Sequence, residues 1–318
     1  MIVQHAMPAE PRWLHPAVPP DLAGFPGLTP WRDRPAVAQA GLNTSVITVV
    51  GTLRDEAVAV ERSFAIWSRQ IVPDWLRGRV EFLFCDDGSS DHPLDLVRTW
   101  SDAGHRVRYL RFRDPGDPAD RSCTLLLNAA IRRFIESPLV LVQWWDRIPG
   151  SFHHLTALLR PHVDLSGIAT SAVSRHIGGS SSVEEMSAEQ LAAMLATVNW
   201  RDDPALLERI AGQIGGHCVP GLASESSGLC LTVDDFVAIG GYDERYRERA
   251  GYANVELFRR LMESGVPVHF ASDWRGQNFH QSHRANRVKD RGWLHDPAVV
   301  RNRGMEWGDA PVVEVWPA

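Results

Sequence analysis

Two carboxylates stand side by side at the end of an apolar run, in the segment Asp86-Asp-Gly-Ser-Ser-Asp91. Residues 80–85 before them are apolar except for Glu81 and are of strand length, so we expect both carboxylates at the carboxyl edge of a sheet. There an aspartate such as Asp87 can accept two charge-assisted hydrogen bonds from a ligand hydroxyl or base edge. The alternative is a helix N-cap followed by a turn, for which the same residue types are well suited. We expect Asp87 to be a surface carboxylate.

The segments around this turn alternate between strand and helix patterns. Apolar runs of strand length occupy residues 45–50, 80–85, 107–112 and 139–145. Helical spacing of apolar residues occupies 57–67, 94–100 and 125–135. This order predicts an α/β fold with a doubly wound, mostly parallel central sheet and helices on both faces. In such sheets ligands bind beyond the carboxyl ends of the strands, where the 86–91 turn is expected.

The rest of the chain is less regular. A mobile segment rich in Gly and Ser is expected at 174–182. Strands are expected at 168–173, 228–233, 266–271 and 311–316, and helices at 188–198, 204–214 and 255–262. Residues 1–43 hold a cluster of prolines with Trp13 and Trp31 between them. We expect this arm to be irregular and to lie across the main domain or a partner subunit.

Three motifs follow one another in a consistent order: the 86–91 turn, Gln143-Trp-Trp-Asp146 and Gly240-Gly-Tyr-Asp-Glu244. Together with Leu126-Leu-Asn128 before the second motif, they make residues 44 to 285 resemble family 2 glycosyltransferases with the GT-A fold. The resemblance implies one GT-A domain behind the 1–43 arm. Its nucleotide-sugar half is residues 44–160, and its acceptor half is residues 161–318, with a helical insertion at 183–215 and a C-terminal tail.

The resemblance also assigns the nucleotide contacts. Asp87, with Asp86 beside it, looks like the family aspartate that binds the nucleoside. The stretch from Thr52 to Asp55 looks like the first loop, which contacts the base, and Arg121 is similar in position to a basic residue near the base.

Asp146 corresponds to the last acidic residue of the family's Asp-x-Asp motif, which implies a divalent cation, Mg²⁺ or Mn²⁺, against the donor diphosphate. Trp144 replaces the first aspartate and cannot ligate a metal. His280 or His283 could complete the ligand shell; a histidine at the surface or hydrogen-bonded in the core is the alternative. A basic run could instead screen the leaving group directly, or be a solvated loop: Arg284, Arg287, Lys289 and Arg291.

The two tryptophans 144 and 145 could form a platform on which a sugar stacks. One of the two is expected in the core, because alternate residues of a strand face opposite sides.

The general base is where the sequence departs most from the family. The family's Glu-Asp pair appears here as Ala253-Asn254, and an amide cannot take a proton from a hydroxyl. Glu256 is the nearest substitute, although two positions turn a side chain about 200° around a helix. Glu225 and Asp243 are the other candidates, with a solvated surface carboxylate as the alternative for each. For an acceptor that is already ionised, such as a thiol, Asn254 suffices as a hydrogen-bond partner.

Composition excludes several classes of function. The 318 residues include 33 Lys and Arg against 39 Asp and Glu, a formal charge of −6, which argues against nucleic-acid binding. The apolar stretches are far shorter than the roughly 20 residues that cross a bilayer, so we expect no membrane anchor. The four cysteines form no C-x-x-C pair, which favours a reducing cytoplasm.

With the resemblance, these observations predict a glycosyltransferase that moves a sugar from a nucleoside diphosphate, expected to be UDP, to a small-molecule or glycan acceptor. The resemblance implies that the transfer inverts the configuration at the sugar. The acceptor would lie against residues 174–227 and the Gly240–Glu244 element. The alternative is a catalytically impaired relative that binds nucleotide sugars or acts as a scaffold, because the carboxylates expected at 144 and 254 are missing. The N-terminal arm could join two copies into a homodimer.

Overall fold

The computed structural model describes residues 45–115, 123–164, 169–178, 217–220, 228–244, 253, 257, 260–261, 264–266, 268–271, 274–281 and 310–317. The arm at 1–43 and the helices expected at 188–198 and 204–214 lie outside these residues, as do residues 179–182 of the segment expected at 174–182.

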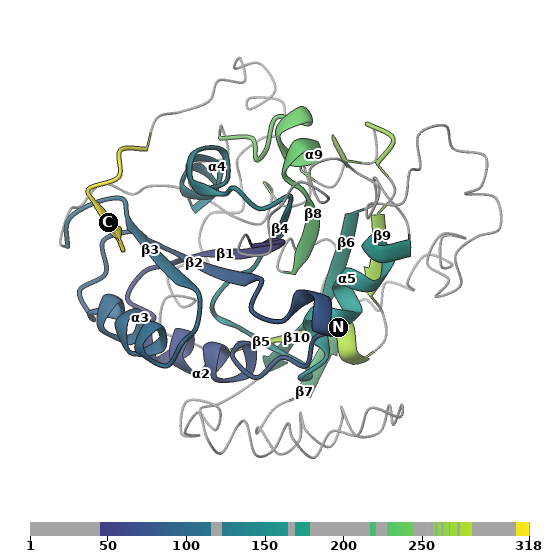
Figure 1. Cartoon of the computed structure of the whole chain (residues 1–318), viewed down its shortest axis with the longest axis horizontal. Helices are drawn as coiled ribbons and strands as arrows, with labels where there is room; N and C mark the ends of the chain where they lie inside the picture. The colour runs from purple at the N-terminus through teal and green to yellow at the C-terminus, as the bar shows by residue number, and fades with distance from the viewer. Residues whose placement is uncertain are drawn as a thin grey trace, which may run out of the picture.

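Within the described residues, eleven strands form one sheet in the order β11-β3-β2-β1-β4-β8-β6-β10-β5, with β7 and β9 paired to β6 (Figure 1). The strands are β1 (Ile47–Leu53), β2 (Val80–Asp86), β3 (Val107–Arg111), β4 (Leu139–Val142), β5 (Arg147–Pro149), β6 (Ala169–Gly178), β7 (His217–Pro220), β8 (Leu229–Thr232), β9 (Val268–Ala271), β10 (Gln277–His280) and β11 (Glu314–Trp316). The central run β3-β2-β1-β4 is parallel, while β11 and β8 pair antiparallel on either side of it.

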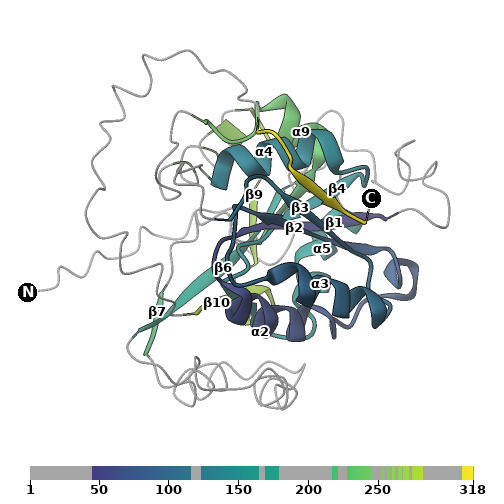
Figure 2. The same cartoon turned by 90° about the vertical axis from the view of Figure 1, so that its left-hand side faces the viewer.

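Helices cover both faces of the sheet. Figures 1 and 2 show α2 and α3 on one face, and α4 and α9 on the other. The helices are α2 (Ala57–Trp67), α3 (Pro93–Asp102), α4 (Cys123–Phe134), α5 (His154–Asp164) and α9 (Val233–Ala238), with 3-10 turns at Asp74–Leu76 and Trp274–Gly276. The α/β fold with a mainly parallel central sheet and helices on both faces is confirmed.

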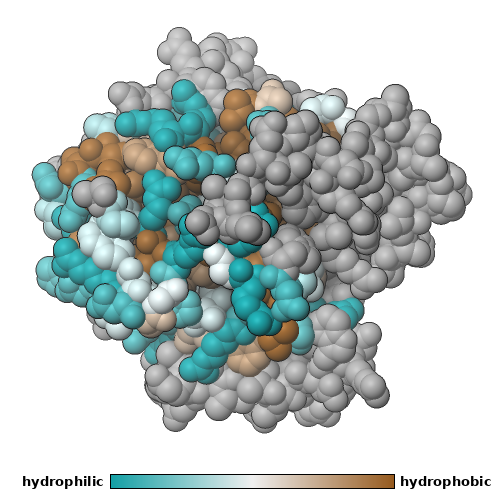
Figure 3. All heavy atoms as spheres, viewed as in Figure 1, coloured by the Kyte–Doolittle hydropathy of each residue, from teal (hydrophilic) through white to brown (hydrophobic). Residues whose placement is uncertain are grey.

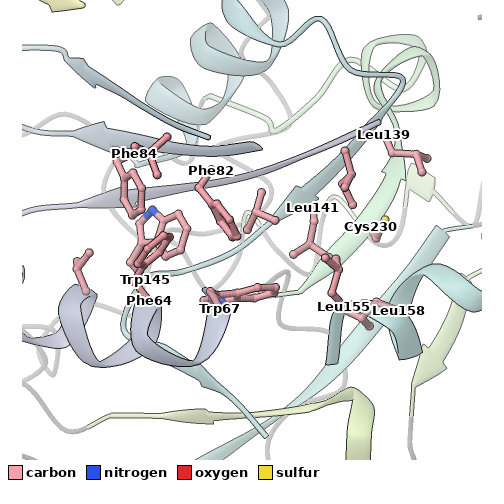
Figure 4. Packing of buried hydrophobic residues seen from close by; sticks show 14 of the residues in the cluster. Phe64, Trp67, Phe82, Phe84, Leu139, Leu141, Trp145, Leu155, Leu158 and Cys230 are labelled. Atoms are coloured by element: carbon pink, nitrogen blue, oxygen red, sulfur yellow. The ribbon is translucent and has the colours of Figure 1, made fainter. Parts of the chain in front are cut away.

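The core is divided by the sheet into two clusters. Between the sheet and α2, aromatic rings from both elements pack together (Figure 4), with Phe64 edge-on to Phe82 at 5.0 Å and Phe84 stacked on Trp145 at 4.3 Å between ring centroids. On the opposite face, α4 packs through residues such as Leu127 and Ile131. Both clusters bury large side chains completely, which stabilises the strands that carry the site.

The surface that belongs to described residues is hydrophilic over the outer side of α3 (Figure 3). Among the described residues, none of the helices combines the length and the apolar character that crossing a bilayer requires.

Several boundaries differ from the expected ones. β4 ends at Val142 rather than at 145, because a turn follows Gln143, in which Arg147 donates its backbone N–H to Trp144 O at 2.9 Å. β6 continues to Gly178, into the segment expected to be mobile, because β7 and β10 pair with it. The sequence pattern did not indicate β5, α5, β7, α9 or β10, which are short or contribute only part of their length to the core.

Candidate functional site

The strands β1, β2 and β3 end level with one another, and β4 ends three residues earlier on the other side of β1. Leu53 at the end of β1 is opposite Asp86, and Asp86 is opposite Arg111 at the end of β3. On the other side of β1, Val50 is opposite Val142 at the end of β4. The residues that follow these strands therefore meet at one edge, as in other parallel sheets that bind ligands.

The loop after β1 and the turn after β2 are bonded to each other. Asp87 donates its backbone N–H to Leu53 O at 3.0 Å, and Asp55 donates its N–H to Ser89 Oγ at 3.0 Å. In return, Ser90 donates from its backbone N and its Oγ to Asp55 Oδ1, at 2.7 and 2.9 Å. The two segments form one surface rather than two independent loops.

Asp55 takes a left-handed backbone conformation, with φ 52°, which is unusual for a residue other than glycine. Its carboxylate bonds to Ser90, together with the bond from its own N–H to Ser89, hold it there. Thr52, at the end of β1, is buried, and Asp55 is exposed. Of the expected base-contacting stretch, the exposed end is therefore the part that a ligand can reach.

Asp86 is fully buried, and protein groups engage both its carboxylate oxygens. Oδ1 accepts from Ser89 N at 2.9 Å and from Ser89 Oγ at 2.5 Å, while Oδ2 accepts from the Tyr109 hydroxyl and lies 3.7 Å from Arg111 Nε. Burial and the Asp86 charge raise the pKa of Tyr109, which therefore stays a donor. Asp86 orients the turn, as the turn part of the alternative anticipates, but it is not a helix N-cap, because the N-cap of α3 is His92.

Asp87 is not the surface carboxylate that the sequence suggested, because only 7% of it is exposed and it is clamped by a buried arginine. Arg113 donates from Nη2 to Asp87 Oδ2 at 2.8 Å and from Nε to the Asp87 carbonyl oxygen at 2.6 Å. The guanidinium of Arg54, half exposed, lies 4.0 Å from the same Oδ2. Two bonds from one planar group fix both the backbone and the side chain of Asp87.

Glycine at position 88 makes this clamp possible. Gly88 has φ 80°, and a Cβ there would lie 2.8 Å from Arg113 Cγ and 2.9 Å from Asp114 O. A larger residue would both strain the backbone and displace Arg113.

The turn after β4 is anchored to β1 by Trp145. Its indole Nε1 donates to Gly51 O at 2.9 Å, and a Cβ on Gly51 would overlap Gln143 O at 1.8 Å. Trp145 is fully buried, whereas Trp144 is partly buried against the opposite core cluster. The expectation that one of the two tryptophans packs into the core is confirmed.

Asp146 follows Trp145 and forms an ion pair with its neighbour Arg147, Nη1 to Oδ2 at 3.1 Å. The Asp146 carbonyl accepts from Gln281 N at 2.9 Å, and the antiparallel register of β5 and β10 places His280 opposite Arg147. The backbone of the expected second metal ligand is therefore close to Asp146 in the sheet. Its side chain is outside the described set.

The side chains that could ligate a metal ion near Asp146 do not by themselves form a divalent-cation site. Among the side chains that the structure describes, no three His, Cys, Asp or Glu residues gather into a group that could hold a metal ion. The one carboxylate expected as a ligand, that of Asp146, is already engaged by a guanidinium. The cation held by Asp146 and His280 stays a prediction from the sequence.

Asn128 of α4 holds the Gly240–Glu244 element, where the sequence places the acceptor. Its Nδ2 donates to Tyr242 O and to Glu244 Oε1, both at 2.8 Å, and its Oδ1 accepts from Tyr242 N at 2.9 Å. Asp243 is fully buried, so it is not the solvated carboxylate that was its alternative. Two motifs that are far apart in the sequence are joined by one amide.

Apart from Asp243, the residues expected at the base are not described. Asn254, Glu256 and Glu225 lie outside the described residues, as does Arg121. Ala253, next to Asn254, is fully buried in the cluster under α4. The catalytic assignments at these positions stay predictions.

Sequence reasoning missed Arg113 and Arg147. A signal for the first exists: Tyr109, Arg111 and Arg113 are spaced by two along and just beyond β3, so they share the side that faces the two aspartates. For Arg147 the sequence shows only that a cation follows Asp146.

Comparisons with known proteins give structural likeness only. No family model matches the chain, and no curated protein matches it in sequence. A mannosyltransferase from Pyrobaculum calidifontis, solved with GDP-Man and Mn²⁺, aligns at 14% identity and a TM-score of 0.49 over 75% of this chain and 57% of its own. GalNAc-T7, solved with UDP, GalNAc and Mn²⁺, aligns at 12% identity and a TM-score of 0.49 over 76% and 44%.

The glucosyl-3-phosphoglycerate synthase from Mycobacterium tuberculosis, solved with phosphoglyceric acid, aligns at 19% identity and a TM-score of 0.45 over 83% of this chain and 80% of its own. The chain spans about half the length of the mannosyltransferase and of GalNAc-T7. At these scores the likeness carries no assignment of activity, which has to come from the site itself.

Proposed function

We propose that the protein is a glycosyltransferase that binds a nucleoside-diphosphate sugar, with UDP as the expected nucleotide, across the carboxyl ends of β2, β1 and β4. The observation that carries this proposal is the clamp on Asp87. Arg113 is nearly inaccessible and fixes an aspartate beside a loop that is itself bonded in place. A carboxylate held in this way is suited to accept hydrogen bonds from a nucleobase or a ribose.

The second half of the donor would lie toward Asp146. β2 and β4 are both neighbours of β1, so the two strands lie two strand spacings apart across the sheet, about 10 Å, and β4 ends three residues before the level of Asp86. A nucleoside diphosphate can bridge that span with its nucleoside at Asp87 and its phosphates near the turn after β4. The sugar would then face the Gly240–Glu244 element, where we place the acceptor, a small molecule or a glycan.

We also propose, from the family resemblance, that the transfer inverts the configuration at the sugar and that one of the residues named below is the base. A single in-line displacement needs one base and no protein nucleophile. Asn254, Glu256 and Glu225 are the candidates for the acceptor contact. Binding of the donor, as proposed, does not depend on which of them serves, nor on the cation predicted at Asp146 and His280.

A non-catalytic protein that binds nucleotide sugars is the second candidate, and two observations favour it. Asp146 is paired with Arg147, and Ala253 is buried at a place where the family resemblance calls for an acid. Both would remove turnover and leave nucleotide binding intact.

A transfer and hydrolysis assay with a panel of nucleotide sugars, with and without Mn²⁺, tests the proposal. Consumption of one donor supports the transferase. Binding of UDP without consumption of any donor supports the non-catalytic candidate, and absence of nucleotide binding contradicts both.

A further inference from the structure

Arg147 occupies the position where the site needs positive charge. Its guanidinium contacts Asp146 Oδ2 at 3.1 Å, and Asp146 is the residue that we place nearest the donor phosphates. The two side chains keep 8% and 11% of their surface exposed, whereas Arg113 in the Asp87 clamp keeps 1%. Arg147 is therefore held in place and still has accessible surface.

The turn that carries Arg147 is fixed on several sides. Arg147 donates its backbone N–H to Trp144 O at 2.9 Å, and its carbonyl accepts from Ser63 Oγ at 2.6 Å and from Gln143 Nε2 at 3.1 Å. The neighbouring Asp146 carbonyl is held by Gln281 N. A cation fixed in this way interacts with an anionic ligand without paying for reorganisation when the ligand arrives.

The same geometry disfavours a metal ion on Asp146. A divalent ion bound to either oxygen of the Asp146 carboxylate would share that carboxylate with a guanidinium that lies 3.1 Å from Oδ2, and the two positive charges would repel each other at low dielectric. Trp144 supplies no ligand, and the described side chains offer no group of three acidic, histidine or cysteine ligands.

We infer that Arg147, oriented by Asp146, is the counter-charge for the diphosphate of the donor, and that nucleotide binding needs no divalent cation. The inference rests on the proposed function, because it assigns the phosphate-binding part of that same site. Guanidinium binds phosphate oxygens through two parallel N–H groups, so it can hold the diphosphate in one orientation.

Calorimetric titration with UDP and with uridine, each in EDTA and in Mn²⁺, tests the inference on the full chain. Wild-type protein is expected to bind UDP equally well in both buffers. Arg147→Gln is expected to weaken UDP binding about tenfold and to leave uridine binding unchanged, because uridine has no phosphate. Arg147→Lys should keep most of the affinity, and Arg98→Gln on α3, which alters an exposed arginine remote from the site, should keep all of it.

Asp146→Asn distinguishes UDP binding that depends on the Arg147 guanidinium from UDP binding that depends on a metal ion at Asp146. If Arg147 is the counter-charge, this variant still binds UDP in EDTA. UDP binding that is lost in EDTA, or that is equal in Arg147→Gln and wild type, overturns the inference while the proposed function stands. If wild-type protein binds neither uridine nor UDP in either buffer, the proposed function fails and the inference fails with it. Should Arg147→Gln not fold, the EDTA titration of the wild type and the Lys variant still decide.

Discussion

The ends of β2 and β4 each present an aspartate that is bonded to an arginine, but the two pairs are built differently. Asp87 is held by Arg113, which comes from beyond the neighbouring strand and also bonds the Asp87 carbonyl. Asp146 is held by the next residue in the chain, whose side chain keeps 8% of its surface exposed, against 1% for Arg113. In the first pair the arginine positions the aspartate; in the second, as we propose, the aspartate orients an arginine toward the ligand.

Under the proposed function, the difference lets one sheet edge bind two chemically different parts of one ligand. A clamped carboxylate accepts hydrogen bonds from neutral groups such as those of a nucleobase or a ribose. A clamped guanidinium receives an anion. Loss of Arg113 should therefore affect nucleoside and nucleotide alike, whereas loss of Arg147 should affect only ligands that carry phosphate.

Replacement of Arg113 should have the largest effect. Arg113→Met leaves the carboxylate of Asp87 nearly buried without its main counter-charge, which costs about 3–5 kcal/mol of the free energy of unfolding. Uridine and UDP affinities should fall by the same factor. Chemical denaturation and calorimetry measure both, with Arg98→Met as the surface control, expected within about 0.5 kcal/mol of wild type. A loss confined to UDP would erase the proposed difference between the two arginines.

Gly88→Ala tests whether the Arg113–Asp87 clamp needs the close approach of the Arg113 side chain to the backbone at position 88. Gly88 and Gly104 have similar φ values, 80° and 89°, but only Gly88 has neighbours within 4 Å of a built Cβ. Gly104→Ala should cost about 1–2 kcal/mol from the left-handed backbone alone. Gly88→Ala should cost about 1–3 kcal/mol more and weaken uridine binding, because Arg113 must move. Equal losses of stability in the two variants would mean that the contact with Arg113 is unimportant.

Removal of the hydrogen bonds between Asp55 in the loop after β1 and Ser90 in the turn after β2 should have a smaller effect on stability and on nucleoside affinity. Asp55→Ala removes the acceptor of both Ser90 bonds and retains the left-handed φ, so we expect a loss of about 1–2 kcal/mol and a several-fold weaker nucleoside affinity. Asp55→Asn keeps an acceptor oxygen and tolerates the backbone conformation, so it should lie near wild type. If both variants bind uridine like wild type, the loop does not help to form the site.

The smallest effect concerns pH and lies away from both strand ends. Burial lowers the pKa of His105 below 6.5, and burial together with Arg275 lowers that of His153. The folded state therefore prefers the neutral rings, so this contribution to stability is present above the unfolded pKa and is lost as the pH falls below it. Denaturation at about pH 8 and about pH 5 should show a shallower pH dependence in His105→Gln than in wild type. A steeper dependence in the variant would reverse the assigned direction.

The fold was predictable wherever a local pattern encoded it. Strand-length apolar runs at 80–85 and 107–112 with a helix between them were sufficient to predict parallel strands, and the apolar spacing of Val60, Phe64 and Trp67 marked the buried face of α2. β10 was not predictable, because its pairing with β5 and β6 depends on strands that are distant in the sequence.

The site was predictable in its position and only partly in its chemistry. The 86–91 turn was recognised at a strand end, but the burial of Asp87 follows from the register between β2 and β3, which brings Arg113 to it. Likewise, the pairing of Asp146 with Arg147 depends on the turn that begins at Gln143, where β4 was expected to continue. A single sequence does not contain these contacts between elements.

The central claim is that Asp87, presented by Arg113, binds the nucleoside of the donor. Asp87→Asn keeps the size of the side chain and an acceptor for Arg113 and removes the charge, so the protein should unfold cooperatively. Calorimetric titration with UDP should then show a loss on the order of 3 kcal/mol, more than a hundredfold in affinity. A folded Asp87→Asn variant with the UDP affinity of the wild type would contradict the account.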